Sequence, residues 1–279
     1  MTEHTVVAAE AADPEEASMA RVLVIVPFPF EEGGMDNRKA QLKTLSFGPD
    51  IDFDYRPVKA APAMFDSYHD WLLADLAILE AGLTAQEDGY DAVCIDTTSD
   101  SGMNALRSVL DIPVIGAGRA SYLMALMFGR TFAVLTQWDP WIPEAKKTVV
   151  EYGLSDLCVA IESINRPPDM ENLLGGKEEE IFPLLVEAGM RCVEKGADAI
   201  CLGSTTMHQA HAHLVEHLPV PVINPGPLSY KIAQTAIDLG LSQSRTAYNK
   251  PLVPKTDLIH AMLERAADLE GTFTQPELS

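Results

Sequence analysis

A long internal repeat constrains the fold of this chain more than any other feature of its sequence. The stretch EAGLTAQEDGYDAVCIDTTSDSG begins at Glu80, and the similar stretch EAGMRCVEKGADAICLGSTTM begins at Glu187. The two align at a constant spacing of 107 residues, which pairs Thr97 with Ser204, and the repeat resumes after one inserted residue where DIPVIGAG matches VPVINPG. A repeat of this length predicts two copies of one α/β unit, each containing a strand that ends in a hydroxyl-rich turn.

Strand and helix patterns alternate on both sides of these turns. RVLVIVPF and RTFAVLTQ are apolar runs of buried-strand length, followed by the strand patterns IDFDYRPV and DLCVAIESIN. Apolar residues at helical spacing predict a helix from Tyr68 that ends at Gly89, and another from Lys177 with Pro183 near its first turn. This alternation predicts an α/β fold of two pseudo-symmetric parallel-sheet domains with the active site in the cleft between them. The expected organisation is a disordered acidic leader (1–18), a first α/β unit (19–118) with a returning helix (227–240), a second unit (119–226) and a C-terminal tail with a short helix (241–279).

Composition narrows the class of protein. A formal charge of −21 excludes a basic stripe that could neutralise phosphates, so we expect no binding to nucleic acid. No apolar run approaches the length of a membrane span, and the N-terminus lacks a signal pattern. Four cysteines without regular spacing predict neither a disulfide framework nor a zinc site. We therefore expect a cytoplasmic protein.

The two turns are the first place to look for chemistry, and Thr97 and Ser204 are their first hydroxyl residues. Hydroxyls are poor bases but good hydrogen-bond donors, so we expect them to bind a substrate anion or a developing enolate. The alternative is that they only cap the following helices, a role that is compatible with anion binding. The further substrate-binding candidates in these turns are Thr98, Ser99, Thr205 and Thr206.

Four residues near the turns are candidates for the base that such a site needs: Asp96, Asp100, Asp139 and His208. Only His208 has an ordinary pKa near neutrality, and it could equally be a capping or solvent-facing histidine. Asp96 directly precedes Thr97 and is the second base that we would test. The histidines of MHQAHAHL lack the carboxylate pattern of a metal site, so we expect no metal.

The cysteines are expected to be structural. Cys94 and Cys201 lie three residues before Thr97 and Ser204, an odd offset that places them on the opposite face of their strands. Cys158 falls in a strand pattern and Cys192 in a helix pattern, where a free thiol is commonly a small buried hydrophobe.

The loops that follow the first strand of each unit should form the entrance to the site. Ligands of doubly wound proteins bind at the carboxyl ends of the strands, so PFPFEEGG and QWDPW are the entrance loops. Aromatic residues there favour a substrate with an apolar or planar part, although loop packing explains them equally well. Neither a dinucleotide fingerprint nor a phosphate-binding loop occurs, so we expect no cofactor. The entrance candidates are Phe28, Phe30, Asn37 and Trp138.

Three stretches carry a resemblance to a known family: DGYDAVCIDTTSDSGMNALRSVLDIPVIGAGRAS, then GADAICLGSTTM, then PVPVINP. Over roughly residues 21–240 the chain resembles the aspartate/glutamate racemase superfamily, and its hydantoin racemase branch in particular. The resemblance implies two α/β domains related by a pseudo-twofold axis, with the active site between them. It also implies one catalytic cysteine in each turn, at the positions that Thr97 and Ser204 occupy here.

The function that follows is a cofactor-independent racemase or isomerase. We expect proton transfer at a carbon next to a carbonyl or carboxylate of a small hydantoin-, amino-acid- or dicarboxylate-like substrate, in a homo-oligomer. One alternative is a lyase or decarboxylase that forms the same enolate-type intermediate and needs only one proton transfer. The other is a protein that binds a small anion without turnover.

Overall fold

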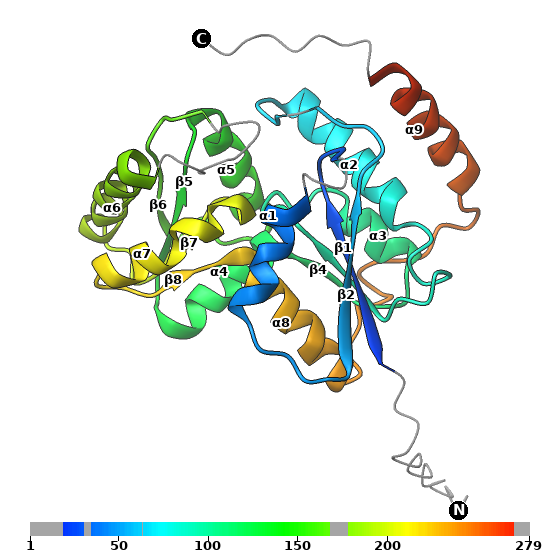
Figure 1. The fold of residues 1–279 in the computed structure, drawn as a ribbon, viewed down its shortest axis with the longest axis horizontal. Helices are drawn as coiled ribbons and strands as arrows, with labels where there is room; N and C mark the ends of the chain where they lie inside the picture. Colours follow the sequence, from blue (N-terminus) through cyan, green and yellow to red (C-terminus); the bar gives the residue numbers. More distant parts are fainter. Residues whose placement is uncertain (1–18, 31–34, 63, 168–177, 271–279) are drawn as a thin grey trace, which may run out of the picture.

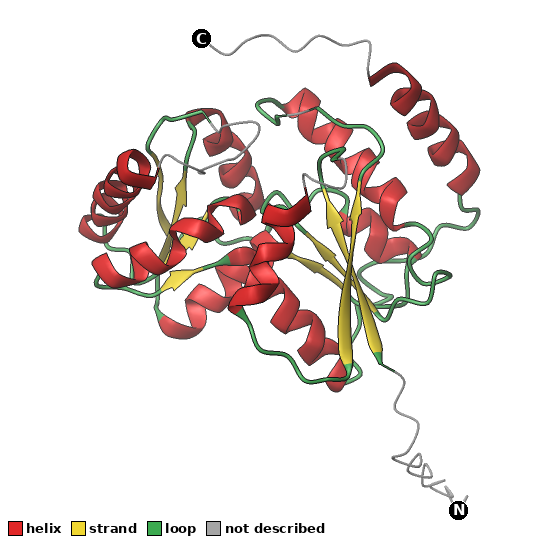
Figure 2. Cartoon of the chain, in the orientation of Figure 1, coloured by secondary structure: helices red, strands yellow, loops and turns green. Residues whose placement is uncertain are grey.

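Two four-stranded parallel sheets form the frame of the molecule in the computed structural model, which describes residues 19–30, 35–62, 64–167 and 178–270 (Figures 1 and 2). Their strand orders, β2-β1-β3-β4 and β6-β5-β7-β8, are the same once the repeat is taken into account. The fold class expected from the repeat is therefore confirmed. The strands are β1 (Ala20–Val26), β2 (Ile51–Pro57), β3 (Ala92–Ile95), β4 (Val114–Gly116), β5 (Phe132–Thr136), β6 (Cys158–Ser163), β7 (Ile200–Leu202) and β8 (Val222–Ile223).

Helices follow most of these strands and cover both sheets (Figure 2). They are α1 (Asp36–Lys39), α2 (Tyr68–Gly82), α3 (Met103–Val109), α4 (Ala117–Phe128), α5 (Ile142–Glu151), α6 (Glu178–Glu194), α7 (His211–His217), α8 (Pro225–Asp238) and α9 (Thr256–Glu270). The described residues also form the short 3₁₀ helices η3 (Ala40–Thr44), η4 (Asp139–Trp141) and η5 (Thr205–Ala210).

Two helix boundaries differ from the expectation. Helix α2 ends at Gly82, and turns carry the chain on to Gly89 with its left-handed φ of +79°. A side chain on Gly82 would press against Leu106, so this glycine belongs to the packing of α2 on its neighbours. Pro183 lies inside α6, more than one turn after Glu178, because the buried apolar side chains on either side of it hold the helix together.

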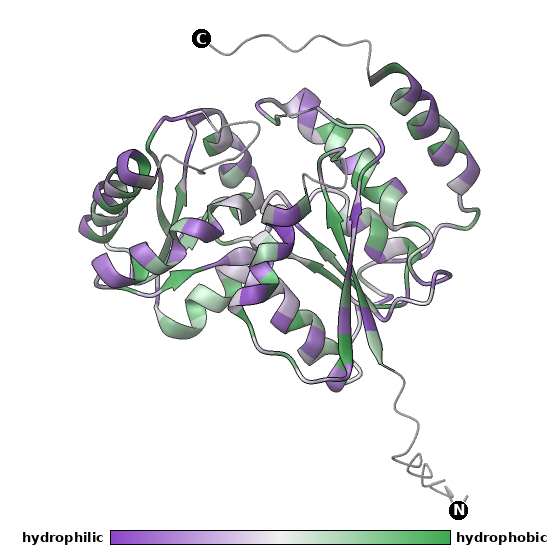
Figure 3. Cartoon of the chain, viewed as in Figure 1, coloured by the Kyte–Doolittle hydropathy of each residue, from purple (hydrophilic) through white to green (hydrophobic). Residues whose placement is uncertain are grey.

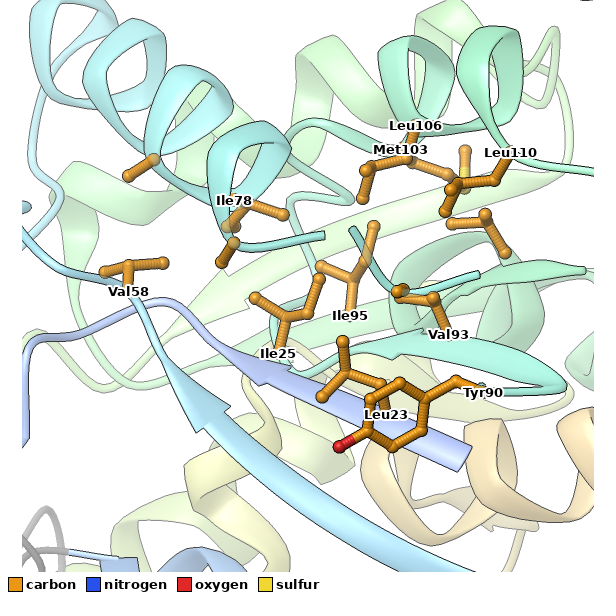
Figure 4. Packing of buried hydrophobic residues seen from close by; sticks show 14 of the residues in the cluster. Leu23, Ile25, Val58, Ile78, Tyr90, Val93, Ile95, Met103, Leu106 and Leu110 are labelled. Atoms are coloured by element: carbon orange, nitrogen blue, oxygen red, sulfur yellow. The ribbon is translucent and has the colours of Figure 1, made fainter. Parts of the chain in front are cut away.

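The first sheet packs one face against α2 and α3 (Figure 4). Ile25 and Ile95 point from neighbouring strands toward Ile78 of α2 and Leu106 of α3, and all four are fully buried. Fully burying such a side chain contributes about 1.5–3 kcal/mol. The core therefore fixes the carboxyl ends of β1 and β3, where the first turn begins.

The two units exchange their last helices. Helix α4 follows β4 of the first sheet, yet its Tyr122 packs on the second sheet and stacks on Phe132, with ring centroids 5.2 Å apart. Helix α8 follows β8 of the second sheet, yet its Tyr230 packs on the first sheet, 5.4 Å from the ring of Phe53. Figure 1 shows both helices at the junction of the two sheets. One face of each sheet is therefore covered by a helix supplied by the other half of the repeat.

Helix α9 packs against α2 at the outer side of the first unit (Figure 1). Leu263 of α9 is buried in the core of this unit. Glu80, which is also buried, accepts a hydrogen bond from Lys59 at 2.8 Å and lies 2.7 Å from Nδ1 of His260. The C-terminal helix is therefore part of the first unit's packing.

Apolar residues concentrate in the strands of both sheets, and polar residues lie on the outer faces of the helices (Figure 3). Among the described helices, none has both the length and the apolar composition that crossing a membrane requires.

Candidate functional site

The hydroxyl-rich turns after β3 and β7 are in direct contact. Thr98 Oγ1 donates a hydrogen bond of 2.7 Å to the carbonyl oxygen of Gly203. Thr205 Oγ1 donates one of 3.1 Å to the carbonyl oxygen of Asp96. Donors and acceptors are each separated by the 107-residue spacing of the repeat, so one hydrogen bond occurs twice, once in each direction. The structure thus brings together the two turns that the repeat singled out.

Thr97 and Ser204 flank this contact and are half-buried. Thr97 Oγ1 lies 3.1 Å from Ser99 Oγ, and Ser204 Oγ lies 2.7 Å from Thr206 Oγ1. Each hydroxyl therefore has a hydroxyl neighbour two residues later in its own turn. A cluster of rotatable hydroxyls can donate hydrogen bonds to an oxygen of a bound molecule.

The capping alternative differs between the two turns. Ser204 is the N-cap of η5, and its side chain accepts a hydrogen bond from the backbone of Thr206. The helix after the first turn begins only at Met103, and its N-cap is Gly102. Thr97, six residues before Met103, does not cap this helix. The capping alternative therefore applies to Ser204 and not to Thr97.

A buried ion pair lies beneath the contact between the turns. Arg38 Nη1 is 3.1 Å from Asp96 Oδ2 and donates a hydrogen bond of 2.9 Å to Thr205 Oγ1. Gln41 Nε2 donates to Asp96 Oδ1 at 3.2 Å. The side chains of Arg38 and Asp96 are 5% and 0% exposed. The negative charge of Asp96 is thus balanced by Arg38, and its carboxylate is shielded from solvent.

Arg38 and Gln41 were not recognised in the sequence. Their signal was weak: they lie three residues apart in DNRKAQL, a spacing that puts both on one face of a helical segment after the first strand. Within the described residues, Nη2 of Arg38 and Oε1 of Gln41 are buried and have no hydrogen-bond partner. Buried polar atoms without partners are rare in folded proteins and call for a physical explanation.

Aromatic rings of the first entrance loop surround this arginine. The Arg38 guanidinium carbon is 5.5 Å from the ring centroid of Phe28 and 6.0 Å from that of Phe30, distances at which a cation is attracted to a ring face. Phe28 in turn stacks on Phe65 at 5.0 Å. The structure therefore places both predicted phenylalanines beside the ion pair.

The second entrance loop contacts the first unit through Trp141. Its indole Nε1 donates a hydrogen bond of 2.8 Å to the carbonyl oxygen of Phe65. Trp138 is half-buried and packs edge-on against Trp141, with centroids 6.3 Å apart. The second entrance loop is therefore bonded to the segment that contains Phe65, and Phe65 in turn stacks on Phe28 of the first entrance loop. The side chain of Asn37, also expected here, lies outside what the structure describes.

Asp100 stabilises the first turn through hydrogen bonds to neighbouring elements. It adopts a left-handed φ of 52° and accepts hydrogen bonds from the backbone of Gly118 at 2.9 Å and of Arg119 at 2.7 Å, in the first turn of α4. The hydroxyl of Tyr152 donates a third, at 2.5 Å. Burial raises the pKa of this carboxyl to about 6, despite these donors. Asp100 thus joins the first turn to α4 and to the second unit.

The other acidic and basic candidates lie in different environments. Asp139 is exposed at the start of η4, and His208 is half-buried in η5, directly after the second turn. Glu144 of α5, which the sequence did not single out, is buried and accepts a hydrogen bond of 2.6 Å from Thr148 Oγ1. Burial raises the pKa of Glu144 to about 7.

The cysteines lie away from the turns, as strand parity predicts. Cys94 and Cys201 are fully buried, facing α8 and α4, where their thiols contact the carbonyl oxygens of Ser229 and Ser121. Burial raises the pKa of both thiols. Thiols with raised pKa are poor nucleophiles and poor bases at neutral pH.

No metal-binding group of three or more His, Cys, Asp or Glu side chains occurs within the described residues. Of the histidines near the second turn, Nε2 of His211 is 3.1 Å from the carbonyl oxygen of Val222, and His213 stacks on His217 at 4.0 Å.

Comparison with known proteins identifies the family. The family model described as Asp/Glu/Hydantoin racemase matches residues 35–233. The chain belongs to this family. A hydantoin racemase from Pseudomonas sp. (strain NS671) is 32% identical over 189 residues, which cover 67% of this chain and 74% of that protein. A hydantoin racemase from Paenarthrobacter aurescens is 27% identical over 68% of this chain and 80% of its own length.

Solved structures of this fold include both racemases and a decarboxylase. Allantoin racemase from Klebsiella pneumoniae superposes with a TM-score of 0.75 at 24% identity, covering 84% of this chain and 95% of that one. Arylmalonate decarboxylase has a TM-score of 0.53 at 18% identity and covers 82% and 96%. The family match supports an enzyme of the isomerase class, a racemase, as the sequence predicted.

Proposed function

We propose that this member of the Asp/Glu/hydantoin racemase family racemises a neutral hydantoin-like substrate, a cyclic amide whose reactive carbon lies next to a carbonyl group. The hydroxyl-bearing turns at Thr97 and Ser204 flank the reactive carbon, at the positions where we expect the family's thiols. The names of the curated relatives support this substrate class.

The observation that carries the proposal is the charge state of the site. Arg38 is already paired with Asp96, so the pair presents no net charge to a substrate carboxylate. The Nη2 group of Arg38 is a buried donor without a partner among the described residues, and a neutral carbonyl oxygen would satisfy it. The neighbouring groups in the turns are hydroxyls, which also donate to a carbonyl oxygen. A neutral amide therefore suits this arrangement better than an amino acid or a dicarboxylate.

The proposed chemistry is a proton transfer. His208 takes the proton from the carbon next to the carbonyl, and the electron pair of that C–H bond moves onto the carbonyl oxygen. The enolate oxygen accepts hydrogen bonds from the turn hydroxyls, which are aimed at the developing charge. A proton from solvent water then adds to the opposite face of the enolate, and His208 releases the abstracted proton to solvent, which gives the other enantiomer. We assign the base to His208 because imidazole is the only one of the candidate side chains whose ordinary pKa lies near neutrality, whereas Asp96 is ion-paired and Asp139 lies exposed in the entrance loop.

Deuterium exchange tests this function directly. Single enantiomers of 5-substituted hydantoins and of amino acids, and achiral arylmalonates, are incubated with the protein in heavy water, and mass and optical rotation are followed. We expect deuterium at the 5-position of a hydantoin together with loss of rotation. Release of carbon dioxide from an arylmalonate would instead establish the decarboxylase alternative, and binding without exchange would establish a non-catalytic protein.

Three variants show whether the exchange occurs at this site. Thr97→Ala and Ser204→Ala should each lower kcat by about 100-fold or more, because removing one donor to a developing oxyanion costs that much. His208→Gln should lower it at least as strongly. Thr131→Val, at the opposite end of the strands, should leave it unchanged. Full activity of all three site variants would contradict the assignment.

We further propose that the enzyme acts in the cytoplasm, without a cofactor, as a homo-oligomer that binds neither nucleic acid nor membranes. The strong negative charge and the four unpaired cysteines support this setting. Exposed apolar side chains on α4, namely Leu123, Met127 and Phe128, support self-association.

A further inference from the structure

We propose that Thr98 and Thr205 are positioning residues, which lock the two turns at a fixed separation and thereby set the geometry of Thr97 and Ser204. This inference rests on the proposed function of the turns. It assigns the two threonines a different role from the substrate binding expected from sequence.

The first support is that both threonine hydroxyls already donate their protons within the protein. Each threonine hydroxyl has one proton to donate, and each donates it to a backbone carbonyl of the opposite turn, Thr98 to Gly203 and Thr205 to Asp96. The residues are 6% and 1% exposed. A substrate would have to break a buried hydrogen bond to use either proton.

The second support is the place of the acceptors. Asp96 and Gly203 immediately precede Thr97 and Ser204, so each hydrogen bond holds the backbone next to a proposed site hydroxyl. The two bonds run in opposite directions between the same two segments. A single bond would leave the turns free to pivot about it, whereas two opposed bonds define both their distance and their relative rotation.

The third support is the packing around the pair. Arg38 donates to Thr205 Oγ1, which orients that hydroxyl toward Asp96. On the other turn, a Cβ on Gly118 would lie 2.1 Å from the carbonyl oxygen of Thr98, so only glycine allows α4 to press against this residue. Both threonines are thus held on their far sides as well.

The test uses valine, which keeps the shape of threonine and removes the hydroxyl. Thr98→Val and Thr205→Val should each lower kcat for hydantoin racemisation by about 100-fold, the effect of a misplacement near 1 Å, with KM changed less than about twofold. Thr98→Ser and Thr205→Ser keep the donor and should recover most of the activity. Because both bonds join the same segments, the double valine variant should be only slightly slower than either single one.

A second measurement does not depend on turnover. Amide hydrogen exchange should rise in the turn opposite to the substitution: at residues 203–206 in Thr98→Val, and at residues 96–99 in Thr205→Val. The matched control is Thr131→Val, which removes another threonine-to-glycine carbonyl hydrogen bond, 2.6 Å to Gly196, away from the turns. It should change neither the exchange of the turns nor kcat.

The outcomes are separable. A raised KM with unchanged kcat would show that the threonines bind substrate and would overturn the proposal. Unchanged amide exchange in the opposite turn would overturn it as well. If the wild-type protein racemises no hydantoin, the proposed function fails, while the exchange measurement still decides whether the threonines lock the turns.

Discussion

Two carboxyl groups, Asp100 and Glu144, are buried, and among the described residues neither has a cationic partner in hydrogen-bond contact. Asp100 accepts three hydrogen bonds and Glu144 accepts one, from Thr148. Burial nevertheless raises the pKa of Asp100 to about 6 and that of Glu144 to about 7. The free-energy cost of removing a carboxylate from water exceeds the stabilisation that these hydrogen bonds give to the charged form. The two groups therefore change charge close to neutral pH.

The raised pKa of Glu144 predicts a pH-dependent stability. The unfolded-state pKa of a glutamate is about 4.3, so the folded state holds its proton more tightly. The stabilisation is complete below the unfolded pKa and is lost as pH rises through about 7. At pH 8, Glu144→Gln should therefore be more stable than wild type by about 1–3 kcal/mol. At pH 4, below the unfolded pKa, the difference should nearly vanish.

Urea unfolding at the two pH values measures this effect. Glu151→Gln, which changes an exposed carboxylate of the same helix, is the control and should not show the gain at pH 8. Equal stability of Glu144→Gln and wild type at pH 8 would mean that Glu144 is not buried in its charged form.

At the scale of the elements, α1 depends on tertiary contacts. It has only four residues, far fewer than an isolated helix needs in water, and continues directly into η3. Arg38 and Gln41 join this segment to Asp96 at the end of β3. The ion pair is thus what holds the segment over the turns.

Breaking this ion pair from one side should be costly. Arg38→Met leaves a buried carboxylate without its partner and should destabilise the fold by about 3–5 kcal/mol. The double variant Arg38→Met/Asp96→Asn removes both charges and should recover a large part of that loss. The exposed pair of Arg21 and Asp54 is the control, and Arg21→Met should destabilise the fold far less than Arg38→Met. Equal stabilities of the single and double variants would contradict this prediction, because they would show that the Asp96 carboxylate costs nothing when it loses Arg38.

Across the whole molecule, the exchange of α4 and α8 makes each half depend on the other. Tyr230 of α8 covers the side of the first sheet that contains Cys94, and Tyr122 of α4 covers the side of the second sheet that contains Cys201. Each tyrosine directly follows a serine, so the same Ser-Tyr pair occurs in both halves of the repeat. Loss of either ring should therefore open the opposite half of the molecule.

Thiol alkylation can detect this exchange. In wild type, Cys94 and Cys201 should react slowly because burial raises the pKa of both thiols. Tyr230→Ala, which should cost about 3–5 kcal/mol, should expose Cys94 and leave Cys201 protected. Tyr122→Ala should show the reverse, so each variant is the control for the other. Mass spectrometry locates the label. Equal labelling of both cysteines in either variant would contradict the prediction that α4 and α8 each cover the sheet of the other unit.

The sequence by itself determined the features that repeat locally. The spacing of 107 residues predicted two equivalent parallel-sheet units, and it identified the turns at Thr97 and Ser204 as equivalent positions. Strand parity predicted that Cys94 and Cys201 face away from these turns. Such inferences succeed because side-chain direction along a strand follows from backbone geometry alone. The catalytic roles of the two turn residues stay a prediction.

Only the tertiary structure decided how the parts meet. Arg38 and Asp96 are 58 residues apart, and Thr98 and Gly203 are 105 apart, so no local pattern reveals their contacts. The use of the Thr98 and Thr205 hydroxyls across the interface and the crossing of α4 onto the second sheet depend on how the two units dock. Hydrogen-bond donors are consumed by whichever acceptor the fold brings near, and that pairing is a property of three-dimensional packing rather than of sequence spacing.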